Sequence, residues 1–144
     1  MLRAVADTHA VIWYIFGDAR LSVTARNTIE QIAAEGNQVA FSSITLAEIV
    51  YLSERGRIDA ATLDRLLRTV DGENAVLTEV PFDRNIAQSL MRVERSQIPD
   101  LPDRIIAATA LYLGLPLISR DRRILPPQNI DSSNHQITKK PHLQ

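Results

Sequence analysis

Four acidic side chains occupy positions from which their carboxylates could meet: Asp7, Glu48, Asp103 and Asp121. Asp7 directly follows the first short apolar run, Glu48 lies just beyond the second, and Asp121 follows the fourth. In open parallel sheets, ligands bind outside the carboxyl ends of the strands. Asp103 begins a helical segment, where backbone N–H groups and the helix dipole favour a negative charge. We therefore expect these four carboxylates to gather at one edge of one sheet.

Carboxylates that gather in this way need a compensating cation, because their mutual repulsion otherwise destabilises the fold. The chain has no cysteine, so a metal ion would have to bind to oxygen or imidazole. Oxygen ligands suit Mg2+ or Mn2+, which also bind substrate phosphate oxygens. One or two such ions can polarise a phosphodiester and activate water for an in-line attack. The acids therefore predict a metal site that hydrolyses phosphodiester bonds.

Each acid also has a purely structural interpretation. The segment from Thr45 to Glu48 fits a capping box, in which the glutamate satisfies a backbone N–H. Asp100 can cap the helix that contains Asp103, and Asp7 can cap the helix that follows it. The fourth acid lies among arginines and could form an ion pair in a turn. Only the joint occurrence of the four acids favours the metal site.

Other residues near the acids keep two interpretations each. His9 could ligate a metal or act as a general base, although a lone histidine more often has a structural or peripheral role. Thr8, Ser42 and Ser43 could hydrogen-bond water or the carboxylates, and such residues also cap turns. Trp13 falls within a short apolar helix, so we expect core packing or a partner contact there rather than base stacking.

Short apolar runs alternate with segments of helical periodicity along the chain. We predict strands at Leu2–Ala6, Val39–Ser43, Ala75–Val80 and Leu115–Ser119. We predict helices at Ala10–Phe16, Val23–Ala34, Leu46–Arg55, Ala60–Val70, Ile86–Val93 and Ile105–Leu113. Strands that alternate with helices favour an α/β fold, in which helices cover both faces of a mainly parallel sheet.

Capping residues and composition set the expected boundaries. Ser22 and Asp59 are good helix N-caps. Glycine follows four helical runs where a helix commonly stops, at Gly36, Gly56, Gly72 and Gly114. From Pro126 onward the sequence is polar and lacks periodicity. We therefore expect one domain over residues 1–125 and a poorly ordered tail over 126–144, with room for one edge strand near Ile130.

The composition is that of a globular protein, with 45% apolar and 23% charged residues. No apolar stretch is long enough to span a membrane and no signal region is evident, so we expect a cytoplasmic protein. The absence of cysteine excludes disulfides and a cysteine nucleophile. The net charge of -1 does not by itself indicate nucleic-acid binding. Arginines nevertheless recur beside the acids, at Arg104, Arg120, Arg122 and Arg123.

Four segments arrive in one order along the chain: VADTHA, SITLAEI, DLPDRIIAATA and GLPLISRD, which end at Ala10, Ile49, Ala110 and Asp121. Together they resemble the PIN-domain family, and their wording and the single-domain length resemble the toxins of VapBC toxin-antitoxin pairs. The resemblance covers most of residues 1–125. Each motif is weak alone, whereas the ordered set is specific.

The resemblance implies a three-layer α/β/α sandwich and an endoribonuclease that depends on Mg2+ or Mn2+ and inhibits translation or growth. It implies inhibition by a cognate antitoxin protein, and a homodimer or a toxin-antitoxin hetero-oligomer. The family's four acids fall on Asp7, Glu48, Asp103 and Asp121, and Asp100 matches a further acidic position. Apolar residues of the early helices are partner candidates, although core burial explains them equally well: Trp13, Ile15, Leu46, Val50 and Leu52.

Two other functions remain open at this point. An aspartyl-phosphate phosphatase also places an aspartate after its first strand. Such phosphatases usually resemble Asp-x-Asp there, whereas this chain has Asp7-Thr8-His9, and its first lysine is Lys139. The second alternative is a module on the same fold that binds RNA or a protein partner with little turnover.

Overall fold

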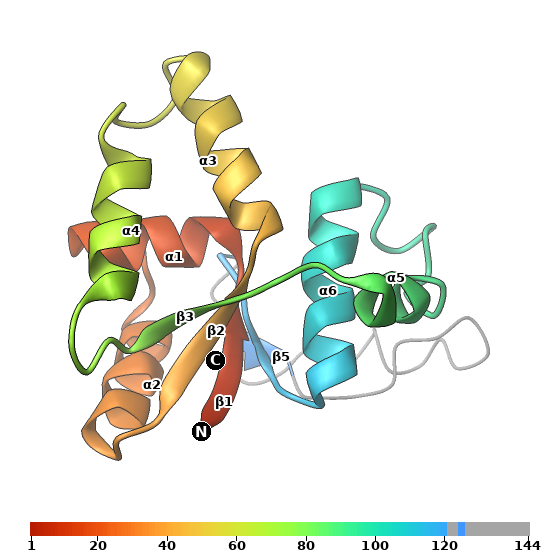
Figure 1. The fold of residues 1–144 in the computed structure, drawn as a ribbon, viewed down its shortest axis with the longest axis horizontal. Helices are drawn as coiled ribbons and strands as arrows, with labels where there is room; N and C mark the ends of the chain where they lie inside the picture. Colours follow the sequence, from red (N-terminus) through yellow and green to blue (C-terminus); the bar gives the residue numbers. More distant parts are fainter. Residues whose placement is uncertain (121–123, 126–144) are drawn as a thin grey trace.

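A five-stranded sheet, with strand order β3-β2-β1-β4-β5, forms the centre of the molecule (Figure 1). The structure is a computed structural model, which describes residues 1–120 and 124–125. The strands are β1 (Leu2–Ala6), β2 (Gln38–Ser42), β3 (Leu77–Val80), β4 (Leu117–Ile118) and β5 (Ile124–Leu125). The first four strands are parallel, and β5 pairs antiparallel with β4. The carboxyl ends of β1, β2 and β4 therefore lie along one edge.

Helices cover both faces of this sheet (Figure 1). One side carries α1 (Thr8–Phe16), α2 (Val23–Ala34), α3 (Ile44–Glu54) and α4 (Thr62–Asp71), and the other carries α5 (Arg84–Leu90) and α6 (Leu101–Leu113). The three-layer α/β/α arrangement that the sequence predicts is thus confirmed. No helix among the described residues is both long and apolar enough to cross a bilayer.

Side-chain alternation along the strands divides the core into two layers, because successive residues of a strand point to opposite faces. Ala4 and Ala6 of β1 belong to the buried cluster that contains Phe41 of β2 and apolar residues of α1 to α4. Val5 lies between them in the chain and belongs to the cluster formed with Ile106 of α6. The unbroken apolar run at residues 4–6 of β1 therefore reflects burial on both faces.

The predicted strands and helices are all present, with shifted boundaries. Four helices begin two to four residues earlier than predicted, at Thr8, Ile44, Arg84 and Leu101. Three of these starts follow an aspartate N-cap, at Asp7, Asp83 and Asp100, whose carboxylate accepts a backbone N–H of the first turn. The prediction located helices by apolar periodicity, which does not fix the first turn of a helix. Ser22 caps α2 as expected.

Two expectations about boundaries differ from the structure. Asp59 does not cap α4, which begins at Thr62; its carboxylate accepts the Ala61 N–H in the preceding turn. The antiparallel β5 was not predicted, because the two residues Ile124–Leu125 are too short to show alternation. The expected edge strand near Ile130 and the tail over 126–144 lie outside the described residues.

Arg104 holds α5 against α6. One guanidinium nitrogen, Nη2, donates to the carbonyl of Leu90 at 3.0 Å and to that of Val93 at 3.1 Å. The guanidinium is thus committed to the end of α5, and Arg104 supplies packing there although it adjoins Asp103 in the sequence.

Replacement of this guanidinium should weaken the fold. We expect Arg104→Met to lower the free energy of unfolding by about 2 kcal/mol, because it removes two charge-assisted hydrogen bonds and keeps most of the apolar stem. Urea denaturation compares the variant with Arg92→Met, whose side chain is exposed nearby. Equal stability of the two variants would contradict the role of Arg104.

Candidate active site

Asp7 lies where β1 ends and α1 begins, and two backbone groups hold its carboxylate. Oδ1 accepts the N–H of Ala10 at 2.9 Å, so Asp7 caps α1. Oδ2 accepts the N–H of Arg120 at 2.8 Å, just beyond β4. The backbone N–H of Asp7 in turn donates to the carbonyl of Ile118 at 2.9 Å. The carboxylate is therefore positioned by both neighbouring segments, and its capping role is real without excluding another.

Burial raises the pKa of Asp7 from 3.8 to about 6. Desolvation of the charged form is the largest cause, and the charge of Asp103 acts in the same direction. The two backbone hydrogen bonds and the positive charge of Arg120 oppose it without cancelling it. At neutral pH, the residues around Asp7 thus compensate the negative charge of its carboxylate only in part.

Glu48 projects from α3 and is bound by a residue of α1. Thr8 Oγ1 donates to Glu48 Oε1, and the same hydroxyl lies 2.9 Å from the Thr45 Oγ1. Both threonines are buried. Thr45 lies inside α3 rather than at its N-cap, and Ser43 makes no side-chain cap hydrogen bond there. The capping-box interpretation of Glu48 is therefore wrong.

Asp100 and Asp103 stand at the start of α6. Asp100 is the N-cap, and its Oδ2 accepts the Asp103 N–H at 3.1 Å, as the sequence predicted. Burial raises the pKa of Glu48, and the charges of Asp103, Asp100 and Asp7 raise it further. Acids from three elements therefore act on one another electrostatically at one edge of the sheet.

The donor chemistry of this edge fits a hard divalent cation. All candidate ligands are carboxylate oxygens, and Asp7, Glu48 and Asp103 share an electrostatic penalty that a cation would offset. Among residues 1–120 and 124–125, no group of three or more acidic or histidine side chains lies within direct reach of one ion. Mg2+ often keeps several waters and binds through one or two carboxylates. Asp121 lies outside the described residues.

His9 is held by an arginine. Its Nδ1 lies 3.2 Å from Arg120 Nη1, and because arginine can only donate, Nδ1 is the acceptor and the proton of the neutral ring is on Nε2. Burial lowers the pKa of His9, and the charges of Arg120 and Arg20 lower it further. The Nδ1 lone pair is used by this contact, which favours the structural interpretation of His9.

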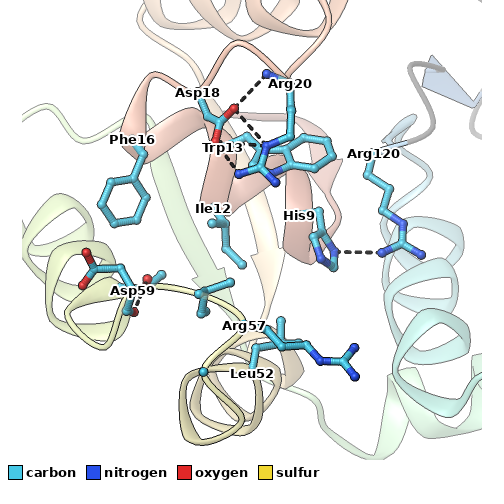
Figure 2. Close-up of a pocket in the computed structure, with 13 residues that line it drawn as sticks. His9, Ile12, Trp13, Phe16, Asp18, Arg20, Leu52, Arg57, Asp59 and Arg120 are labelled. Atoms are coloured by element: carbon cyan, nitrogen blue, oxygen red, sulfur yellow. Dashed lines mark hydrogen bonds and ion pairs between the residues drawn. The ribbon is translucent and has the colours of Figure 1, made fainter.

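A pocket of about 830 Å³ opens beside His9 and Arg120 (Figure 2). Its other walls come from α1, from the α1–α2 loop and from the α3–α4 connection. Trp13 contributes to it while also packing against the core cluster, as expected in part from the sequence. The sequence does not predict this pocket, because its walls come from three segments far apart in the chain, residues 9–20, 52–62 and 120.

Comparisons with known proteins agree with this geometry. The family whose description is PIN domain has a sequence model that matches residues 4–126. Ribonuclease VapC22 of Mycobacterium tuberculosis is 27% identical over 124 residues, which are 86% of this chain and 91% of that protein. The fold resembles that in the crystal structure of VapBC2 from Rickettsia felis bound to a DNA fragment from their promoter, with a TM-score of 0.58 and 21% identity, over 81% of this chain and 86% of the other. It also resembles that in DNA-bound VapBC from Salmonella typhimurium, with a TM-score of 0.53 and 25% identity, over 80% and 83% of the two chains.

The raised pKa of Asp7 predicts a pH-dependent stability. The folded protein binds this proton more tightly than the unfolded chain, so the ionised carboxylate lowers stability progressively as the pH rises from about 4 to about 6. In metal-free buffer, the free energy of unfolding of the native protein should fall over this range by on the order of 2 kcal/mol relative to that of Asp7→Asn. Urea denaturation at several pH values measures the difference, and parallel curves would contradict it.

Proposed function

This chain belongs to the PIN domain family, and on that basis we propose that it is a divalent-metal-dependent endoribonuclease. The observation that carries the proposal is the carboxylate of Asp7, which two backbone N–H groups hold in place while burial raises its pKa. A functional carboxylate is commonly under-compensated in this way, because it is arranged for a ligand. The name of the relative VapC22, Ribonuclease, supports RNA as the substrate.

We assign the metal to Asp7, Glu48, Asp103 and Asp121, either directly or through water. Mg2+ or Mn2+ bound there would polarise the scissile phosphate and lower the pKa of the attacking water. Asp7 is fixed by backbone groups of α1 and of the segment after β4, and Glu48 is oriented by the buried hydroxyl of Thr8. The protein thus supplies carboxylates that are already oriented. In this mechanism water is the nucleophile, and the 2'-hydroxyl of RNA is not.

The biological role that we propose is that of the toxin in a toxin-antitoxin pair. The structures that share the fold are VapBC complexes, and the curated relative carries a VapC name. A cognate antitoxin would bind this protein and inhibit RNA cleavage, within a homodimer or a hetero-oligomer. Released toxin would inhibit translation or growth in the cytoplasm. We place the nuclease domain at residues 1–125 and the tail at 126–144.

The two alternatives have less support. A phosphatase that used Asp7 as a nucleophile would usually resemble Asp-x-Asp at this place, whereas the chain has Asp7-Thr8-His9, and its first lysine is Lys139. A module that only binds RNA or protein would not need several acids that raise one another's pKa.

Cleavage of total cellular RNA by purified, antitoxin-free protein tests the proposal. We expect cleavage with Mg2+ or Mn2+, none with EDTA, and a loss of at least a hundredfold in Asp7→Asn, because transition-state charge stabilisation is removed. Product mapping should find a 5'-phosphate and a 3'-hydroxyl, as water attack with the 3'-oxygen as the leaving group requires. Metal-independent cleavage that leaves a 2',3'-cyclic phosphate would overturn the mechanism.

The hydroxyl of Thr8 should matter for metal affinity. Thr8→Val keeps the buried shape and removes the donor to Glu48, so we expect Mn2+ affinity to fall about tenfold or more. Isothermal calorimetry measures the change. Thr28→Val is the matched control, since that hydroxyl donates only to the Thr24 carbonyl within α2. Equal Mn2+ affinity of the two variants would show that Thr8 does not position Glu48.

A further inference from the structure

We propose that the pocket beside His9 and Arg120 is a subsite for one unpaired nucleotide of the RNA strand, next to the phosphate that is cleaved. Its volume of about 830 Å³ lies within the range of sites that enclose small organic ligands. This inference rests on the proposed function, because it assigns a part of the substrate to a place beside the acidic edge.

Continuity with Asp7 is the first argument. Arg120 donates its backbone N–H to the carboxylate of Asp7 and its guanidinium to His9, and both Arg120 and His9 line the pocket (Figure 2). One residue therefore separates the acidic edge from the pocket. A strand whose phosphate lies at Asp7 can therefore place an adjoining nucleotide within reach of Arg120.

The charge of the pocket is the second argument. Arg20 is paired with Asp18, with 2.6 Å between Nη2 and Oδ2. Arg57 and Arg120 also line the pocket, are exposed, and form no ion pair with the residues that the structure describes. Asp59 bends back to the N–H of Ala61. Guanidinium groups that have no ion-pair partner among the described residues suit a phosphate, which guanidinium can bind bidentately.

The third argument is the aromatic wall. The Arg20 guanidinium lies over the Trp13 ring, 5.4 Å from the ring centroid. The rings of Trp13 and His9 pack edge to face, with centroids 5.7 Å apart and an interplanar angle of 61°. Unpaired RNA bases stack on aromatic rings and on arginine planes. Ile12 and Phe16 add apolar surface to the same pocket. The wall thus suits a base, while Arg57 and Arg120 suit the phosphate attached to it.

Trp13 also makes the proposal testable, because it is the only tryptophan of the chain. Its fluorescence therefore reports on this pocket alone. A short single-stranded RNA of mixed sequence, titrated into the native protein in EDTA and low salt, should change Trp13 emission in a saturable way. Anisotropy of the same RNA with a fluorescein label measures total binding under identical conditions.

Arg57→Ala removes one phosphate contact and leaves the backbone bond from Arg57 N to the Leu52 carbonyl intact. We expect it to weaken RNA binding about tenfold. In a plot of the logarithm of affinity against the logarithm of salt concentration, the slope should become less steep by about 0.7, the value for one phosphate of a single strand. Arg3→Ala is the matched control. Arg3 is exposed near the amino-terminal end of β1, whereas Asp7 follows its carboxyl end. This variant should change neither the affinity nor the salt slope.

Unchanged Trp13 emission on addition of RNA, or equal affinities and salt slopes for the two variants, would overturn the nucleotide subsite. If RNA binds by anisotropy but Trp13 emission does not change, the pocket is instead a candidate contact for a protein partner. Metal-dependent cleavage by the native protein is measured separately, so it can persist while the subsite fails. If cleavage occurs, Arg57→Ala should raise KM with kcat unchanged, as expected when uniform binding is lost.

Discussion

Burial of a carboxylate at the junction of β1 and α1 is the interaction on which the remaining site depends. The carboxylate of Asp7 accepts the N–H of Ala10 in the first turn of α1 and the N–H of Arg120 in the segment just after β4. A charged group in this position costs free energy, which the backbone donors offset only in part. Burial is the source of this cost, and the negative charge of Asp7 is compensated only in part by the residues around it.

The acids around Asp7 come from elements that the sheet order brings together. β1 is flanked by β2 and β4, so the residues that follow these strands share its carboxyl edge. Glu48 reaches that edge from α3 and is fixed there by Thr8, whose hydroxyl is buried next to Thr45. Asp103 belongs to α6 on the opposite face of the sheet. Acids from both helical layers thus influence one another electrostatically.

Much of this arrangement could be predicted from the sequence, because apolar periodicity locates β1 to β4 and the six helices, and parallel topology then places Asp7 and Glu48. The side-chain contacts of residues with a plausible partner nearby in the sequence could not be predicted. Glu48 fits a capping box in the sequence, yet its acceptor bond comes from Thr8, 40 residues away. Arg104 adjoins an acid in the chain, yet its guanidinium binds carbonyls of Leu90 and Val93. Long-range side-chain contacts, including the walls of the pocket, have no periodic signature, and the position of Asp121 remains a prediction.

The hydrogen bond from Arg120 to Asp7 joins residues 113 positions apart. A ribosome releases Asp7 long before Arg120, and domains begin to fold from their amino-terminal side as the chain emerges. While most of this domain is synthesised, β1 therefore has no β4 beside it, and Asp7 lacks one of its two backbone donors. A nascent chain that has not yet delivered the segment after β4 cannot assemble the acidic edge. The order in which the strands leave the ribosome thus delays completion of the site until almost the whole domain has been made.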